Sequence, residues 1–546
     1  MDTRGEIGNS NSTGIRWLHM GIAVLYCVLH FVIGHYHEPW FDEAQAWQIA
    51  KCASIKEILF QIPHYEGHPP LWHLILAIPA KLGAPYELSL QVISLLFSGT
   101  AVVLLLKYAP FKEWIKTLLP FTYFMFYQYS IIARPYCMMM LAIILVAITW
   151  ERRQEKTNLF IASLVFLCMT SAYGIVIAGG ISAAWLVEII YKSPAKIWLK
   201  SRQVRWLCGL FVFACMLIVQ IIPTEDVVAF ADREVDVQVI ILKVIYLLFV
   251  MMPDTLFTTV IGEDIGLNYV TYEAEVWIPA VLLGVLLWWG IFYYGHKTKM
   301  LLWFLIPYVM FALSGIMIYM FVHHIGIIEL VLVFWLWICK VKYKEEGYTD
   351  CIIQRQGNAA GKVILCMVAV SIFVPLFWNI SACVLDIKEQ YYPSRETARF
   401  IKEHNLDEYR IMAEWRENYD RDGVLLSFDT NHIGNAIGML PYFDHNILYV
   451  LNNGSDLLAY DTHNVADDTE NAANIKGWRE KGLPDVLYGT PKLSRVYDGE
   501  ECNYADYRVV YKGKSGVIWK NLQAQDYIRI YVRKELADKL SLHVCE

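Results

Sequence analysis

The stretch WLHMGIAVLYCVLHFVIGH, residues 17–35, decides the class of fold. It is almost entirely apolar and, as a helix, is long enough to cross a bilayer core of about 30 Å. Only Arg4 and Arg16 carry positive charge before it, and no small-residue cleavage site follows it. We therefore expect a retained membrane span and not a signal peptide.

The rest of the chain has the same character. Its 546 residues are 56% hydrophobic and 18% charged, whereas soluble domains are roughly 25% charged. Further apolar runs suit membrane helices. We predict a polytopic α-helical membrane protein of about eleven spans, near residues 17–35, 88–106, 117–132, 137–150, 158–173, 175–191, 206–222, 277–295, 301–321, 325–339 and 363–380.

The distribution of Lys and Arg predicts the orientation. With the N-terminus inside, the inner segments hold about 20 Lys and Arg residues and the outer loops about 6. This bias follows the positive-inside rule. It predicts that the C-terminus, the loop 35–87 and the acidic segment 223–276 lie outside. Residues 238–252 are apolar but short and lie between acidic flanks, so we expect an interfacial or re-entrant helix there.

The sequence changes character near residue 386. Residues 1–385 form the predicted membrane domain, and residues 386–546 are polar, with short strand patterns between helical ones. Such alternation is typical of a small α/β domain. The predicted topology puts this domain on the external face of the plasma membrane. A net charge of −7 without a basic stripe gives no sign of nucleic-acid binding.

Ionisable residues gather in the predicted outer loops. The first loop contains HEPWFDEAQAW (37–47), with Asp42 and Glu43, and EGHPPLWH (66–73), with His68. Later outer turns contain ARPY (133–136) and VHHIG (322–326). Ionisable groups at a membrane boundary are costly, so a functional role is the default interpretation.

These motifs resemble the membrane glycosyltransferases of GT-C fold, in the branch of protein mannosyltransferases and aminoarabinose transferases. The similarity covers roughly residues 15–340 and rests on DEAQAW, HPPLWHLI and ARPY. It implies a polyprenyl-phosphate sugar donor and transfer to a glycan, lipid or protein acceptor on the outer face. It also implies that Asp42 is catalytic. The doublet His323–His324 stands where an arginine beside a histidine is expected.

The residues themselves fit this chemistry. Transfer from a lipid phosphate needs a base for the acceptor hydroxyl, for which Asp42 is the candidate, with Glu43 beside it. Arg134 suits the leaving phosphate, because a guanidinium presents a planar fork of donors. Further donors for the phosphate or substrate are Tyr136, His68, His323 and His324. A single displacement would invert the anomeric centre.

Each residue also has a structural interpretation. Asp42 can cap a helix, with Gln45 three residues on, and Glu43 can simply favour the helix dipole. Arg134 can snorkel from a helix end. In HYEGH (64–68) the alternating His64, Glu66 and His68 leave a divalent metal possible, although no fourth ligand is evident. We therefore predict no certain cofactor or metal residue. Sugar stacking points to Trp40, Trp47 and Trp72, and Glu329 is a candidate for the floor of a cavity.

Two other functions compete with glycosyl transfer. A transporter or flippase of lipid-linked sugars would share the spans and the polar residues, but transporters commonly show internal repeats and broken helices near the midplane. We detect no repeat, and the ionisable cluster lies on one face. A non-enzymatic receptor or assembly protein would use the C-terminal domain but would leave the acids of the first loop unexplained.

Overall fold

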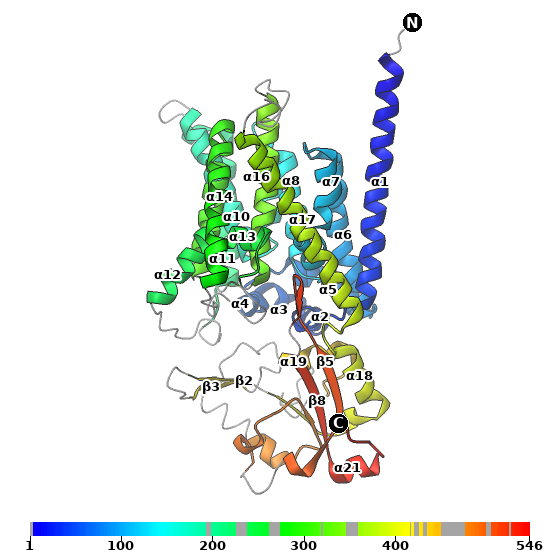
Figure 1. Cartoon of the computed structure of the whole chain (residues 1–546). Coiled ribbons are helices and arrows are strands. Elements are labelled where there is room, and N and C mark those ends of the chain that lie inside the picture. The colour runs from blue at the N-terminus through cyan, green and yellow to red at the C-terminus, as the bar shows by residue number, and fades with distance from the viewer. Residues whose placement is uncertain are drawn as a thin grey trace.

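The computed structural model describes most of the chain. The described residues are 4–192, 198–224, 237–260, 274–317, 320, 322–345, 359–414, 416–419, 425–429, 434–448, 476–497, 504–523 and 526–545. They form a layer of helices and, at one end of it, a smaller part that contains a sheet (Figure 1).

Seven helices in the described part are long and apolar enough to cross a membrane. Because each exceeds the roughly 17 residues that a bilayer core requires, the prediction of a polytopic helical membrane protein is confirmed in this coarse form. The seven are α1 (Arg4–Tyr36, apolar from Gly14), α6 (Tyr86–Tyr108), α10 (Ala172–Lys192), α11 (Arg202–Ile221), α14 (Ala274–Thr298), α16 (Ile327–Glu345) and α17 (Ala359–Lys388).

The other four predicted spans correspond to shorter or broken elements. Three are single helices, α8 (Tyr136–Trp150), α9 (Thr157–Cys168) and α15 (Leu302–Met317). The fourth, predicted at 117–132, is divided into α7 (Glu113–Leu118), a 3₁₀ turn η1 (Leu119–Phe121) and a π-helix η2 (Phe124–Ile131).

Neighbouring side chains satisfy the irregular backbone of η2, in which every residue is buried. Ser94 donates to the carbonyl of Ser130 (2.6 Å), and Gln91 donates to that of Ile131 (3.2 Å). Tyr26 donates to the carbonyl of Met125 (3.0 Å). Non-helical backbone inside a membrane protein is tolerated where protein groups replace the missing bonds. These contacts thus hold the chain just before Arg134.

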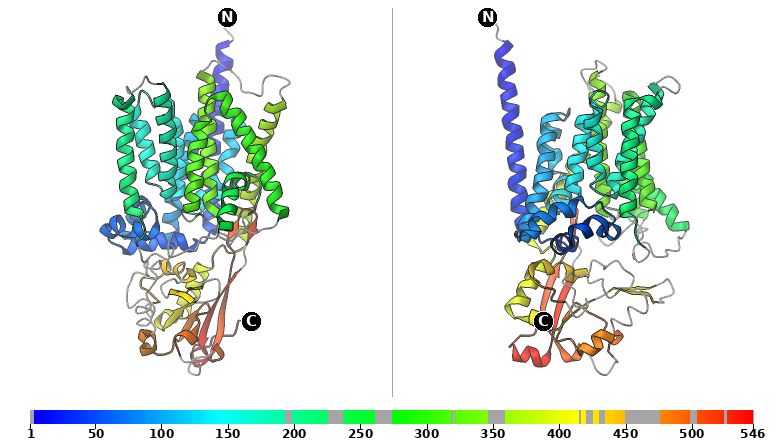
Figure 2. Two further views of the ribbon diagram at one scale, coloured as in Figure 1. Left: turned by 90° about the vertical axis from the view of Figure 1, so that its left-hand side faces the viewer. Right: turned by 180° about the vertical axis from the view of Figure 1, so that it is seen from behind.

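The first loop lies across one end of the helical layer. It contains α2 (Phe41–Cys52), α3 (Ile55–Phe60), α4 (Ile62–Glu66) and α5 (Leu71–Lys81), and the two views of Figure 2 show these blue helices between the long helices and the sheet. We refer to this end as the domain end. Figure 1 places α7 and the N-terminus at the opposite end.

The segment predicted as an interfacial or re-entrant helix is broken into three pieces. They are α12 (Val237–Ile245), a π-helix η5 (Tyr246–Val250) and α13 (Met251–Leu256). Every residue of α13 is buried, and Figure 1 places α13 inside the helical layer. The flanking residues 225–236 and 261–273 lie outside the described part.

The C-terminal part is built on a four-stranded mixed sheet of order β1-β4-β8-β5. Strand β1 (Ile411–Ala413) pairs parallel with β4 (Val486–Tyr488), and β8 (Asp526–Arg533) pairs antiparallel with both β4 and β5 (Tyr507–Ser515). Helices α18 (Ser394–Glu403) and α21 (Lys534–Lys539) pack on it, as the burial of Ala398, Ile401 and Ala537 in one apolar cluster shows. A separate hairpin joins β2 (Arg416–Tyr419) and β3 (Leu425–Asp429).

This C-terminal part contacts the first loop through charge and apolar packing. The guanidinium of Arg395 makes two bonds of 2.8 Å to the carboxylate of Glu87 at the start of α6. Tyr442 donates to the same carboxylate. Ile437 of the short helix α19 (Gly434–Ile437) packs in an apolar cluster with residues of α2 and α5. The two parts therefore share a core at the domain end.

Candidate functional site

The candidate site lies where α2 meets the bend between η2 and α8. Pro135 and the irregular η2 turn the chain here, because proline cannot continue the preceding helix, and Arg134 stands at the bend. The site includes Asp42 at the second position of α2 and the 3₁₀ turn η6 (Val322–Gly326), which precedes α16. Asp42, Arg134 and His323, far apart in sequence, meet here.

An ion pair joins the first two of these residues. Oδ2 of Asp42 lies 2.9 Å from Nη2 of Arg134, and their side chains keep 21% and 13% of their exposure. Burial raises the pKa of Asp42, and the charge of Arg134 opposes that rise. Asp42 is therefore a partly accessible carboxylate whose affinity for a proton is higher than that of an ordinary aspartate, as suits a general base.

His323 is the second partner of the arginine. Nη1 of Arg134 lies 3.0 Å from Nε2 of His323. A guanidinium has no acceptor, so Nε2 must accept, and the neutral imidazole carries its proton on Nδ1. Tyr129 donates to the carbonyl of His323 (2.7 Å) and so holds the turn. Arg134 is thus fixed on two sides and does not snorkel into solvent.

Aromatic rings surround the turn. The rings of His323 and His324 are 4.2 Å apart, and His324 lies 4.5 Å from Tyr173. Tyr136 lies 5.7 Å from His323, and its ring faces Arg134 at 5.5 Å. The hydroxyl of Tyr136 is buried without a hydrogen-bond partner among the described residues. A polar substrate group that reaches this hydroxyl would supply the missing partner.

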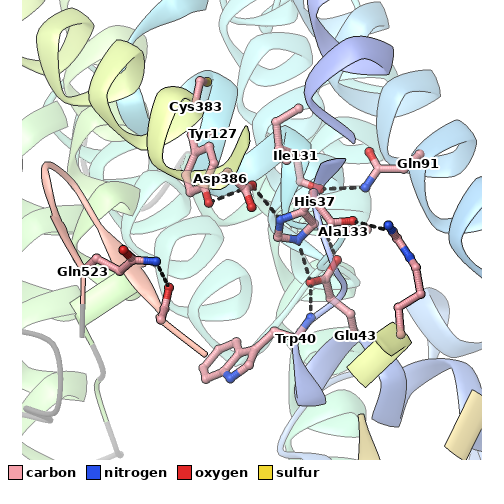
Figure 3. Close-up of polar contacts among 12 residues, drawn as sticks. His37, Trp40, Glu43, Gln91, Tyr127, Ile131, Ala133, Cys383, Asp386 and Gln523 are labelled. Carbon is pink, nitrogen blue, oxygen red and sulfur yellow. Dashed lines mark hydrogen bonds and ion pairs between the residues drawn. The ribbon is translucent and has the colours of Figure 1, made fainter. Parts of the chain in front are cut away.

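Glu43 has an environment quite different from that of Asp42, and Figure 3 shows Glu43 beside Trp40 and His37. It is completely buried, and its carboxylate accepts from the amides of Ala133 (2.7 Å) and Trp40 (2.9 Å). Nε2 of His37 lies 3.2 Å from the same carboxylate, and Nδ1 of His37 lies 2.8 Å from Asp386. Burial lowers the pKa of His37, but Asp386 and Glu43 outweigh it and raise this pKa to about 10.

Two expectations for α2 change on this geometry. The alternative interpretation of Asp42 as an N-cap does not hold, because Trp40 is the N-cap and Glu43, three residues on, accepts from its amide. The catalytic role expected of Glu43 does not suit a carboxylate enclosed by His37 and two backbone amides. Glu43 instead ties the end of α1 and the start of α2 to Ala133, and so positions Asp42 beside Arg134.

His68 lies near the cluster. Burial, assisted by the charge of Arg134, lowers the pKa of His68 to about 3, so the ring is neutral at physiological pH. Its Nδ1 is buried and has no hydrogen-bond partner among the described residues. A neutral His68 can position a substrate hydroxyl but adds no positive charge for a phosphate.

The donor set for a metal does not assemble here. His64 contacts the carbonyl of Ile222 at 2.6 Å, and Glu66 accepts from Gln45 at 3.0 Å. Across the described residues no group of three His, Cys, Asp or Glu side chains is placed to hold a metal ion. The residues present therefore do not fit the metal that the HYEGH spacing leaves possible.

The remaining candidate residues differ in how deeply their side chains are buried. Trp47 and Trp72 pack in the apolar core of the first loop, whereas Trp40 is only partly buried and its ring lies 5.8 Å from the Arg134 guanidinium. Glu329 is buried in α16 and accepts from Thr122 at 2.6 Å. His37 and Asp386 were not among the residues expected from the sequence. Their signal was an ionisable residue at the C-terminal end of each of two apolar helices, α1 and α17.

Comparison of the chain with protein-family models and with curated proteins found no match. The resemblance to GT-C glycosyltransferases therefore stays a prediction. Function is inferred from the residues and their geometry.

Proposed function

We propose that this protein is an integral membrane glycosyltransferase that moves a sugar from a polyprenyl-phosphate donor to an acceptor hydroxyl. The observation that carries this proposal is the partly exposed Asp42–Arg134 ion pair of 2.9 Å at the domain end of the helices. This ion pair places a base and a phosphate-binding cation in direct contact. The backbone and the buried Glu43 network hold both groups in place.

The proposed reaction is a single displacement. The acceptor oxygen attacks the anomeric carbon, and Asp42 takes the hydroxyl proton as the new C–O bond forms. The bond between the anomeric carbon and the phosphate oxygen breaks, and its electron pair leaves with the polyprenyl phosphate. The configuration of the anomeric carbon is inverted.

Arg134 supports the leaving group. Two of its N–H groups face Asp42 and His323, and the guanidinium carries five in total, so donors remain for a phosphate oxygen. Charge-assisted bonds of this kind are stronger than neutral ones. His68, Tyr136, His323 and His324 are the proposed hydrogen-bonding partners for substrate hydroxyls or phosphate oxygens.

The proposed location is the external face of the plasma membrane. The basic inner segments and the acidic residues near the domain end support an orientation with the domain end outside. A polyprenyl donor would place its chain among the apolar helices and its phosphate at the boundary, where Arg134 stands. Acceptors on that face include a glycan, a lipid or a protein.

Purified protein in detergent tests the proposal directly. We expect transfer of labelled sugar from a polyprenyl-phosphate sugar to a mixture of envelope acceptors, with release of polyprenyl phosphate, and no transfer by Asp42→Asn. A transporter or flippase would instead move the intact labelled lipid between the leaflets of proteoliposomes. Movement of the lipid with its sugar–phosphate bond unbroken would contradict the enzyme.

A further inference from the structure

A hairpin of the C-terminal part enters the helical layer. Strands β6 (Ile518–Trp519) and β7 (Leu522–Gln523) pair antiparallel, with Trp519 opposite Leu522, so Lys520 and Asn521 form the tip. Figure 1 shows this orange-red hairpin rising from β5 and β8 beside α17. At the tip, Trp519 is 2% exposed and Lys520 is not exposed at all.

The ammonium of Lys520 is bound entirely by the helical layer and its own hairpin. It donates to the carbonyls of Asp254 and Thr258, both at 2.6 Å, and lies 3.5 Å from Oδ1 of Asp254. The rings of Trp378 in α17 and Trp519 lie 4.4 and 5.0 Å from it. A buried lysine is tolerated only with such compensation.

The backbone conformation at the tip is unfavourable for lysine, which indicates that the side chain of Lys520 is needed at this position. Lys520 has a φ of +56°, in the left-handed region. Two-residue hairpin loops with a positive φ at the first position favour glycine. A residue other than glycine is strained in this conformation. Strained residues persist where the surrounding structure or a function requires them.

The hairpin reaches the His323–His324 turn by two routes. On the first, Lys520 binds α13, and Thr255 of α13 donates to the carbonyl of Ile325 at 3.0 Å. On the second, the ring of Trp519 lies 5.9 Å from that of Phe124. Phe124 in turn packs so closely on Gly326 that a Cβ there would lie 2.1 Å from its ring.

The two routes meet at Ile325 and Gly326, directly after the two histidines. The carbonyl and ring of His323 are held by Tyr129 and Arg134 from the other side. Movement of the hairpin would therefore shift the turn at Ile325 and Gly326, on which Thr255 and Phe124 bear, while Tyr129 and Arg134 hold it at His323.

We propose that Lys520 is a positioning residue: through α13 it holds the His323–His324 turn against Arg134, so the C-terminal part completes the site in the helical layer. The role of the turn in sugar transfer rests on the proposed function. The mechanical link between Lys520 and the turn does not depend on it. Residues outside a site that act through packing of this kind change coupling by about 0.5–2 kcal/mol, which corresponds to roughly 2- to 30-fold in rate.

The test uses the full-length protein and two measurements. Lys520→Met keeps the length of the side chain and removes the charge. Lys514→Met is the matched control, because Lys514 stands in β5 near the same hairpin but pairs with Glu389 on a surface where both side chains are 36% exposed. Backbone hydrogen exchange is followed in residues 322–327 and 251–260, and sugar transfer is measured at saturating donor.

We expect Lys520→Met to speed exchange in both segments and to lower the turnover number roughly 2- to 30-fold, with Lys514→Met like the parent. Exchange in 322–327 that matches the parent would overturn the proposal. If Lys520→Met fails to fold, Lys520→Gly gives the answer, because glycine suits the positive φ while the ammonium is lost. Parent-like exchange in that variant overturns the proposal equally. Faster exchange in a protein whose parent transfers no sugar would refute the glycosyltransferase but keep the mechanical link.

Discussion

Asp42 and Glu43 are consecutive residues of α2, yet the side chain of the first is 21% exposed and that of the second is completely buried. Asp42 faces Arg134, and Glu43 faces His37 and two backbone amides. Successive helical residues point about 100° apart, so one turn of helix presents one acid to the site and buries the other. This division gives the two acids different expected responses to substitution.

Asp42→Asn should abolish transfer without loss of fold. Asparagine keeps the shape but cannot take the acceptor proton, and general-base losses are about 10²–10⁴ in rate. Because Asp42 is not the N-cap of α2, the helix should be unaffected. Turnover and thermal unfolding of the detergent-solubilised protein measure the two effects. A variant that transfers sugar at the parental rate would remove Asp42 from the reaction.

Glu43→Gln should act chiefly on stability. It leaves His37 with one carboxylate in place of two in a fully buried setting, and breaking a buried ion pair costs about 3–5 kcal/mol. We expect a lower unfolding temperature and a lower yield of folded protein. The folded fraction should retain more activity than Asp42→Asn. Normal stability combined with lost turnover would instead make Glu43 catalytic.

Arg134→Lys should keep the positive charge but lose the planar set of N–H donors of the guanidinium. Lysine cannot bridge Asp42 and His323 as the guanidinium does. A charge-assisted hydrogen bond contributes about 1.5–3 kcal/mol, so we expect a loss of roughly 10- to 100-fold in kcat/KM. Titration of donor binding checks the assignment. Unchanged donor affinity in Arg134→Ala would show that another residue holds the phosphate.

The pH profile should report the raised pKa of Asp42. A base must be deprotonated, so activity should be lost as the pH falls through that pKa, at a pH above the ordinary aspartate value of about 4. Removing the opposing charge with Arg134→Gln should move this acid limb to still higher pH. The residual sugar transfer of Arg134→Gln, measured across the pH range, gives the pH at which its activity is lost. A limb that moves down instead would exclude Asp42 as the titrating group.

Cysteine labelling should establish the orientation. Cys52 in the first loop and Cys545 near the C-terminus are both exposed. A membrane-impermeant maleimide applied to intact cells should therefore modify single-cysteine variants that retain either one. His296→Cys at the basic, opposite end should react only after permeabilisation. The reverse pattern would place the site on the cytoplasmic side.

Much of the architecture follows from local sequence. Apolar length predicts the helices, because backbone groups in a membrane must bond within their own segment. This argument succeeded for regular spans such as α6 and α10. It failed at 117–132, where Ser94 and Gln91 of another helix satisfy the carbonyls of a π-helix. No local pattern reports such a remote donor.

The sequence also names Asp42, Glu43, Arg134 and His323 as candidates, but it does not give the contacts between them. An acid pair at a membrane boundary marks a site, because burying charge is costly. Which of Asp42 and Glu43 faces Arg134 depends on the rotation of α2 against α8, and this rotation is set by Ala133, His37 and Asp386. His37, which contacts Glu43, also contacts Asp386, a residue 349 positions further along the chain.

Hydrophobicity and charge act locally along the chain, so the sequence indicates a helical membrane protein with ionisable groups in the loops between its apolar segments. Which of these groups meet depends on the tertiary structure. The Asp42–Arg134–His323 cluster and the buried Lys520 depend on contacts between distant segments, whose free energies come from packing and desolvation in three dimensions.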